Sequence, residues 1–154
     1  MWTLSPDGKP SPLRVSPYNE TNGQFSPGPA GGSRWLAYSS DESGRNEIYV
    51  QSYPDGANRI PVSTSGGIQP MWSPDGKELF YVTGDSVVAV ARQPGGSFGS
   101  PRKLFDRSTM LFNHRFHTYA VTPDGRFLMI RRDPAAVPRQ LNVILNWTGG
   151  SIRP

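Results

Sequence analysis

A turn motif followed by an apolar run occurs twice in this chain, and a third time in a stretched form. The complete copies are Trp-Ser-Pro-Asp-Gly-Lys at 72–77 and Val-Thr-Pro-Asp-Gly-Arg at 121–126. The stretched copy begins with Phe-Ser-Pro at 25–27 and continues with Arg-Trp-Leu-Ala-Tyr at 34–38. In such a turn proline presets φ, aspartate bonds to nearby backbone and glycine accepts a positive φ. Each copy is therefore predicted to end one strand, reverse the chain and begin a buried strand.

The spacing of this motif constrains the architecture more than any single residue does. Once the extra residues of the stretched turn are removed, the first period is about 43 residues. Periods of about 40–45 residues that contain four short strands are typical of β-propeller blades. The sequence therefore predicts an all-β fold, a partial β-propeller of about three four-stranded antiparallel blades. The 17 glycines and 16 prolines agree with a fold rich in turns.

Three blades are fewer than a closed propeller needs, since known rings have at least about four. We therefore expect the chain to be the C-terminal part of a larger propeller, or to associate with copies of itself. The predicted units are 1–18 as the last strands of a preceding blade, 19–66 and 67–115 as complete blades, and 116–154 as an incomplete C-terminal blade.

Each of the three later units has a predicted inner strand, whereas the first unit supplies only a hairpin. Inner strands are expected at 23–26, 69–73 and 116–122, with Trp72 filling the space between two blades. A third strand of the last blade is predicted at 140–147.

In the first unit, the segments 2–4 and 13–15 are predicted to pair across the turn at 5–8. The intervening Lys-Pro-Ser-Pro at 9–12 cannot form a buried strand, because proline lacks the backbone N–H that a central strand donates.

The turn motif, together with two further strings, resembles TolB-type (WD-like) propeller repeats over nearly the whole chain. The strings are Asn-Glu-Ile-Tyr-Val at 46–50 and Leu-Asn-Val-Ile-Leu-Asn-Trp at 141–147. The second string and residues 45–51 are also similar to propellers found C-terminal to bacterial serine/threonine kinases. The resemblance implies a non-catalytic binding or scaffold module of an envelope protein or a kinase-linked sensor, and it favours a periplasmic or extracytoplasmic location.

Propellers usually bind through the loops that enter the inner strands and through the loops that join second to third strands. In this chain the candidate ligand or partner residues on those loops are Asp41, Glu42, Arg45, Gln69, Asp85, Arg115 and His117. The expected ligand is a protein or a small molecule, in addition to missing upstream blades or a second copy of the chain.

No catalytic residue is predicted, because the motifs of the relevant enzymes are absent. The sequence has no glycine-rich phosphate loop, no His-Arg-Asp loop, no Asp-Phe-Gly and no Gly-x-Ser-x-Gly nucleophile elbow. We expect this chain not to be an enzyme and to need no cofactor. The alternative is that it forms the propeller part of a prolyl-oligopeptidase-like hydrolase or of a polysaccharide lyase.

Metal binding is not expected from the few suitable side chains. His114 and His117 are three residues apart in a predicted strand, where such residues face opposite sides. Asp41 and Glu42 with Asn46 could bind a cation, but a solvated turn is the preferred explanation for these residues. There is no cysteine for a thiolate site.

The charge is distributed unevenly along the chain. Residues 1–91 carry 6 Lys and Arg against 9 Asp and Glu, whereas residues 92–154 carry 10 against 3. The basic residues are scattered over separate predicted loops, so nucleic acid is not an expected partner. No apolar stretch is long enough to span a bilayer.

Overall fold

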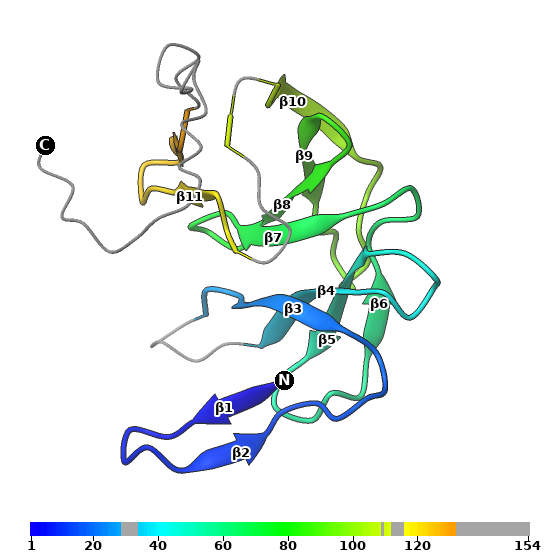
Figure 1. Cartoon of the computed structure of the whole chain (residues 1–154), viewed down its shortest axis with the longest axis vertical. Helices are drawn as coiled ribbons and strands as arrows, with labels where there is room; N and C mark the ends of the chain where they lie inside the picture. Colours follow the sequence, from blue (N-terminus) through cyan, green and yellow to red (C-terminus); the bar gives the residue numbers. More distant parts are fainter. Residues whose placement is uncertain (29–33, 109, 112–115, 132–154) are drawn as a thin grey trace, which may run out of the picture.

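The protein is described by a computed structural model over residues 1–28, 34–108, 110–111 and 116–131. Within these ranges there are twelve strands and no helix, and the strands form four antiparallel sheets (Figure 1). The predicted all-β class is confirmed. The division of the chain into blades stays a prediction at this point.

The first four-stranded sheet is a meander in chain order. It consists of β3 (Glu20–Phe25), β4 (Trp35–Ser40), β5 (Glu47–Ser52) and β6 (Arg59–Pro61). The hairpin between β5 and β6 turns at Gly56, which has a φ of 65° and donates its N–H to the Ser52 carbonyl at 3.1 Å. Only glycine takes up such a positive φ at little cost, which explains its place in the turn.

The second four-stranded sheet repeats this order. It consists of β7 (Ile68–Trp72), β8 (Glu78–Thr83), β9 (Ser86–Ala91) and β10 (Arg102–Asp106). The repeated motif forms the turn between β7 and β8. The Ser73 hydroxyl accepts the Glu78 N–H at 2.9 Å, and the Asp75 carboxylate accepts the Lys77 N–H at 3.1 Å. The buried strand predicted to follow this turn is observed as β8.

Two hairpins complete the described chain. The N-terminal hairpin pairs β1 (Trp2–Leu4) with β2 (Pro10–Pro12), and the C-terminal hairpin pairs β11 (Tyr119–Val121) with β12 (Phe127–Met129). The predicted inner strand at 116–122 is thus shorter than expected, and the predicted strand at 140–147 lies outside the described residues.

The predicted pairing of 2–4 with 13–15 is wrong. Trp2 lies opposite Pro12 and Thr3 opposite Ser11, so the prolines themselves belong to the second strand. This strand is exposed along its whole length, and proline is tolerated on an edge that faces solvent. The expectation that 9–12 forms no buried strand still holds.

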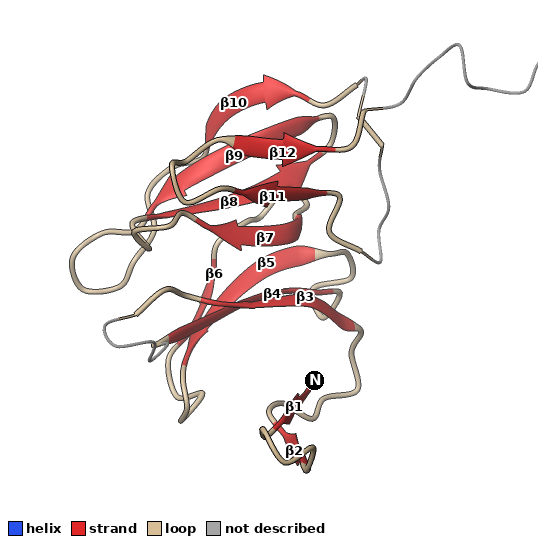
Figure 2. Cartoon of the chain, turned by 90° about the vertical axis from the view of Figure 1, so that its left-hand side faces the viewer, coloured by secondary structure: helices blue, strands red, loops and turns tan. Residues whose placement is uncertain are grey.

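The sheets are stacked face to face in chain order, with the hairpins at opposite ends of the stack (Figure 2). Alternating side chains point to opposite faces of a strand. On β4, Ala37 therefore faces the second sheet, whereas Leu36 and Tyr38 face the N-terminal hairpin, where Met1 and Leu13 pack on them. The core between the two four-stranded sheets consists of Ala37, Ile48, Val50, Val62, Trp72, Leu79, Tyr81, Val88 and Val90.

A second core lies between the second sheet and the C-terminal hairpin. Its buried members are Ile68, Phe80, Val82, Val87, Ala89 and Tyr119, with Met71, Leu104, Phe105, Val121, Phe127 and Met129 partly buried around them. The first strands of successive sheets also lie side by side, since β7 contacts both β3 and β11. The stack therefore has an inner edge formed by β3, β7 and β11.

Candidate functional site

The loops predicted to bind a ligand gather at one end of the stack, which we call the loop end. In the first sheet Ser40 is paired with Glu20 on one neighbouring strand and with Glu47 on the other. The segment that enters β3 and the loop 41–46 are therefore neighbours. In the second sheet Val82 is paired with Ile68 on one neighbouring strand and with Val87 on the other. This pairing brings the segment 62–67 next to the tight turn 84–85. The sheet register alone therefore places these loops together.

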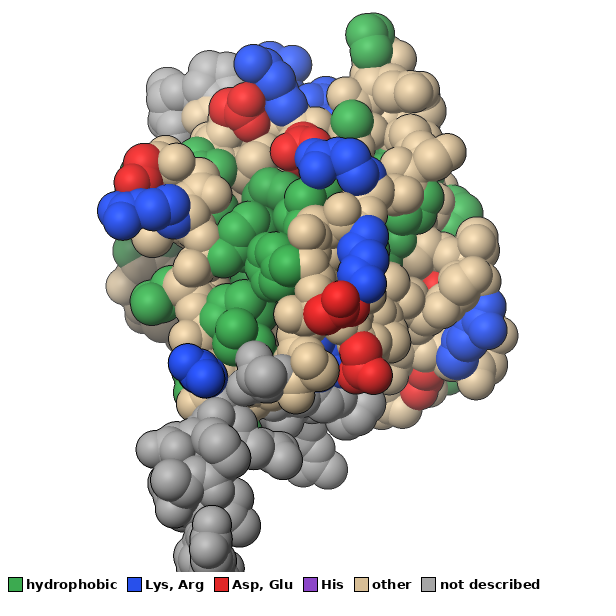
Figure 3. All heavy atoms as spheres, turned by 90° about the horizontal axis from the view of Figure 1, so that it is seen from above, with side chains coloured by type: hydrophobic (Ala, Val, Ile, Leu, Met, Phe, Trp, Pro, Cys, Tyr) green, Lys and Arg blue, Asp and Glu red, His purple; other side chains and the backbone are tan. Residues whose placement is uncertain are grey.

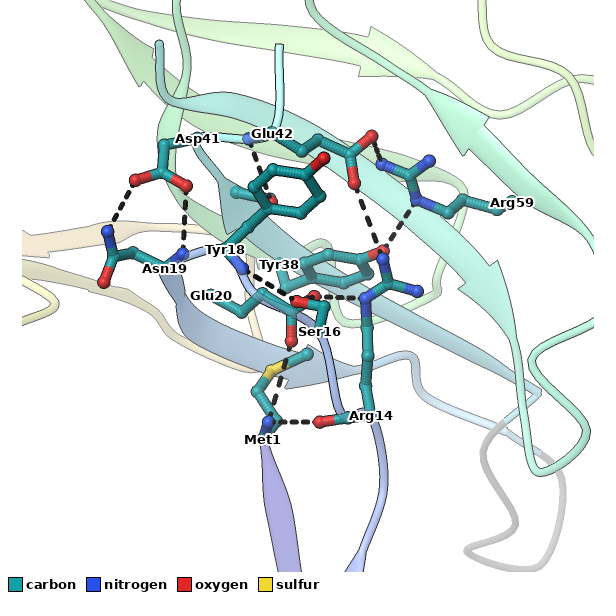
Figure 4. A network of polar contacts seen from close by, with 11 residues as sticks. Met1, Arg14, Ser16, Tyr18, Asn19, Glu20, Tyr38, Asp41, Glu42 and Arg59 are labelled. Atoms are coloured by element: carbon teal, nitrogen blue, oxygen red, sulfur yellow. Dashed lines mark hydrogen bonds and ion pairs between the residues drawn. The ribbon is translucent and has the colours of Figure 1, made fainter. Parts of the chain in front are cut away.

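Asp41 is tied to the segment that enters β3 (Figure 4). Its carboxylate accepts the Asn19 backbone N–H at 2.9 Å and the Asn19 side-chain amide at 2.6 Å. These hydrogen bonds stabilise the ionised carboxylate, and they lower the pKa of Asp41. Asp41 thus holds two loops of the loop end together while its side chain remains open to solvent.

Glu42 belongs to a network of charges beneath Asp41 (Figure 4). It forms ion pairs with Arg59 and, at 3.5 Å, with Arg14. The Arg59 Nε donates to the Tyr38 hydroxyl at 2.9 Å, and its guanidinium lies 4.0 Å from the centre of the Tyr49 ring. Arg14 also pairs with the buried carboxylate of Glu20. Because each of these charges has a partner, the network does not present a free charge to a ligand, and removal of one member would leave a buried charge uncompensated.

Burial in this network also changes the titration of a tyrosine. Desolvation raises the pKa of Tyr38 although the Arg59 guanidinium acts in the opposite direction. Tyr38 is therefore a neutral hydrogen-bond acceptor for Arg59, and no proton-transfer role follows from it.

Arg45 lies beside a buried carboxylate. Its Nε is 2.7 Å from Glu47 Oε1, and Glu47 also accepts the Gly66 N–H at 2.9 Å and the Ser63 hydroxyl. Glu47 thereby fixes the segment that leads from β6 into β7. An open cavity of about 420 Å³ lies here, lined by Ser43, Gly44, Arg45, Glu47, Tyr49, Pro61, Ser63 and Thr64.

Asp85 lies on the other side of the segment 62–67. It occupies the turn between β8 and β9, its side chain is 84% exposed, and its nearest cation is the Arg107 guanidinium at 3.7 Å. Arg107 donates through Nε and Nη2 to the Gly84 carbonyl, which fixes this turn. A second open cavity, of about 410 Å³, is lined by Asn46, Gly66, Gly67, Ile68, Val82, Thr83, Gly84, Asp85 and Arg107.

Gln69 is completely buried and connects the second sheet to the C-terminal hairpin. Its side-chain oxygen accepts the Thr118 N–H at 3.1 Å and the Thr118 hydroxyl at 3.0 Å, and its carbonyl accepts the Tyr119 hydroxyl at 2.8 Å. Burial raises the pKa of Tyr119, which keeps that hydroxyl a donor. Gln69 sits at a bulge of β7 with a φ of 56°. It lies near the loop end but not on its surface.

His117 is half-buried next to the same bulge. Its Nε2 lies 3.0 Å from the Pro70 carbonyl, a distance at which a protonated Nε2 donates a hydrogen bond. Arg115 and His114 lie outside the described residues. Of the seven predicted residues, Arg45 and Asp85 line open cavities. Asp41 and Glu42 hold the loop 41–46 to neighbouring segments, and Gln69 and His117 lie at the inner edge.

Sequence reasoning did not identify Arg14, Glu20, Glu47, Arg59 and Arg107 as parts of this end. Only Glu47 could have been identified from the sequence. Glu47 begins a strand whose next residues are apolar, and a charged side chain that is buried in such a strand needs a partner. The partners of the others come from segments far apart in the chain.

The described residues contain neither a metal-ligand cluster nor a membrane-spanning helix. In residues 1–28, 34–108, 110–111 and 116–131 there is no group of three or more His, Cys, Asp or Glu side chains that could hold a metal ion. The same part of the chain contains no helix that is long and apolar enough to cross a membrane. No protein-family model matches this chain, and no characterised protein is significantly similar to it.

Proposed function

We propose that this chain is part of a TolB-like β-propeller and serves as a non-catalytic module that binds an extended segment of a partner protein across its loop end. Support for the propeller comes from three arrangements: the repeated four-stranded meander, the face-to-face stacking of successive sheets, and the common inner edge of β3, β7 and β11. The sequence resemblance to kinase-linked and envelope propellers supports a role in signalling or in the cell envelope.

The shape of the cavities at the loop end favours a protein segment as the ligand. Two of the open cavities at the loop end lie on either side of the segment 62–67, and each is open to solvent rather than enclosed. Small-molecule sites usually enclose most of their ligand, whereas two neighbouring shallow cavities suit successive side chains of an extended chain. Arg45 at one cavity and Asp85 at the other give that surface a charge of each sign.

A displayed library of random peptides selected on the purified chain tests this proposal. Asp85→Lys is expected to weaken a selected peptide about tenfold, which equals ~1.4 kcal/mol of binding free energy. Asp7→Lys is the matched control, because Asp7 is another exposed carboxylate but lies in the turn of the N-terminal hairpin. Failure to select any peptide, or equal weakening by both substitutions, would contradict the proposal.

A further inference from the structure

Arg45 is held at the loop end by one edge of its guanidinium. Its Nε donates to Glu47 Oε1 at 2.7 Å, and its Nη2 donates to the Thr64 carbonyl. A guanidinium is planar and has further N–H groups on a second edge, between Nη1 and Nη2. Among the described residues no acceptor bonds to that second edge. Arg45 therefore keeps hydrogen-bond donors for a ligand.

The ion pair of Arg45 differs from other ion pairs of the surface. Figure 3 shows basic and acidic side chains next to one another on the face where β10 lies. In such a pair both partners are solvated: the Arg102 side chain is 63% exposed, and its partner Glu78 is 36% exposed. In the described ranges, Arg45 with Glu47 is the one pair that joins a largely exposed cation, at 60%, to a buried carboxylate, at 4%. Exposed pairs are loosely held, whereas the buried carboxylate of Glu47 orients Arg45.

Glu47 is itself fixed by two further hydrogen bonds. Its Oε1 also accepts the Gly66 N–H at 2.9 Å, and its Oε2 accepts the Ser63 hydroxyl. These bonds hold the carboxylate, and through it the Arg45 guanidinium, before any ligand arrives. A side chain that is already oriented loses less conformational freedom when it binds.

The charge at the first open cavity favours a ligand group with one negative charge. Arg45 is the one cation among the described residues that line this cavity, and Glu47 offsets part of its charge. A phosphate group carries a charge of about −1.5 to −2 and would be poorly compensated there. A carboxylate carries one charge, and its two oxygens match the parallel N–H groups of a guanidinium edge.

The remaining lining also suits an acidic side chain. Tyr49 and Pro61 supply apolar surface for its methylene groups, and Thr64 carries a hydroxyl that can donate to a carboxylate oxygen. The second open cavity does not suit such a group, because the exposed carboxylate of Asp85 there has the same charge. An acidic group is thus confined to the cavity that Arg45 lines.

We propose that Arg45 determines the specificity of the loop end by binding the side-chain carboxylate of an aspartate or glutamate in the partner segment. The carboxylate oxygens accept the N–H groups of the free edge, while Glu47 and Thr64 keep theirs. A side chain is the source, because an extended segment that lies across both cavities presents its side chains to them. This inference rests on the proposed function and names the chemistry of its ligand.

Changes in a selected peptide test the carboxylate on the parent protein. Each selected peptide is expected to contain an aspartate or glutamate whose change to the amide weakens binding about tenfold, the effect of one charge-assisted hydrogen-bonded pair. With Arg45→Gln, the same change in the peptide should weaken binding less than about twofold, because the two groups are coupled. The first measurement uses the parent protein alone, so unfolding of a variant cannot produce its result.

Arg45→Lys separates the guanidinium edge from the charge. It keeps a cation beside Glu47, so the buried carboxylate stays compensated, but lysine has no planar edge. This variant should bind the acidic peptide and its amide form with nearly equal affinity. Full affinity of Arg45→Lys for the acidic peptide would overturn the assigned geometry.

Arg126→Gln is the matched control. Arg126 also donates through Nε to a carboxylate two positions away, that of Asp124 at 2.8 Å, but it lies in the turn between β11 and β12. This variant should bind the selected peptide as the parent does. Amidation of the C-terminus of the peptide should likewise change nothing, since the carboxylate belongs to a side chain.

The outcomes distinguish this inference from the proposed binding function. Selected peptides without an acidic residue, equal weakening by Arg45→Gln and Arg126→Gln, or loss of binding on amidation would overturn the role of Arg45 and leave the binding function intact. Failure to select any peptide contradicts the binding function, and this inference with it.

Discussion

The position of a side chain in the stack of sheets decides whether it is buried and joins two sheets or remains accessible to a ligand. Gln69 and Asp85 were both predicted to face a ligand, yet one is completely buried and the other is among the most exposed side chains of the loop end. Gln69 uses its polar atoms to join two sheets. Asp85 has only a long ion pair and remains accessible.

Trp72 is the residue whose removal should cost most. It is 5% exposed between the two four-stranded sheets, and its Nε1 donates to the Gln24 carbonyl of β3 at 3.2 Å. Trp72→Ala should lower the free energy of unfolding by about 3–5 kcal/mol, because it leaves a cavity and an unpaired carbonyl. Urea denaturation measures this difference.

Asp41→Ala is the comparison for Trp72→Ala, since Asp41 is a partly exposed side chain of the loop end that loses only its hydrogen bonds with Asn19. Its unfolding midpoint should fall much less than that of Trp72→Ala. Equal midpoints for the two variants would mean that Trp72 is not a core residue.

Elements of this fold depend on the repeated turn, which uses an aspartate as hydrogen-bond acceptor. In the turn between β7 and β8, hydrogen bonds from Ser73 and from the Lys77 N–H lower the pKa of Asp75. The same arrangement with Thr122 lowers the pKa of Asp124 in the turn between β11 and β12. Both turns are therefore held by an ionised carboxylate.

This chemistry predicts a loss of stability in acid. Because the folded pKa of Asp75 lies below its usual value of 3.8, its contribution is present above that pH and is lost as the pH falls through the folded pKa. Thermal melting between pH 5 and pH 2 should show a falling midpoint, and Asp75→Asn, which keeps an acceptor but cannot titrate, should show a smaller fall. An identical pH profile for the two proteins would contradict the assignment.

The whole molecule is a stack whose middle layers are covered on both faces. Strands β4, β5, β8 and β9 are almost entirely buried, whereas β1, β2 and β12 are exposed or partly exposed. Local stability follows buried contacts. Hydrogen exchange followed by mass spectrometry should therefore be slowest in the four middle strands and fastest in the N-terminal hairpin. Uniform exchange over all twelve strands would be incompatible with the stacked arrangement.

Much of this fold could be predicted from the sequence because strand period and turn chemistry are local properties. The Pro-Asp-Gly turn at 74–76 and the apolar run that follows it lead directly to β8 and to its pairing with β7. The sequence also indicated that Arg45 and Asp85 lie on loops at one end, since strand order determines which loops are adjacent.

Only the tertiary structure decided which side chains are covered and which strands meet. It paired β1 with the prolines of β2, buried Gln69, and joined Arg14, Glu42 and Arg59 around Tyr38. These contacts join residues about 10 to 50 positions apart, and their energies depend on desolvation and on the face that a neighbouring sheet covers. A local sequence pattern carries no information about such coverage, which is why most strands could be predicted and the partners of the loop-end side chains could not.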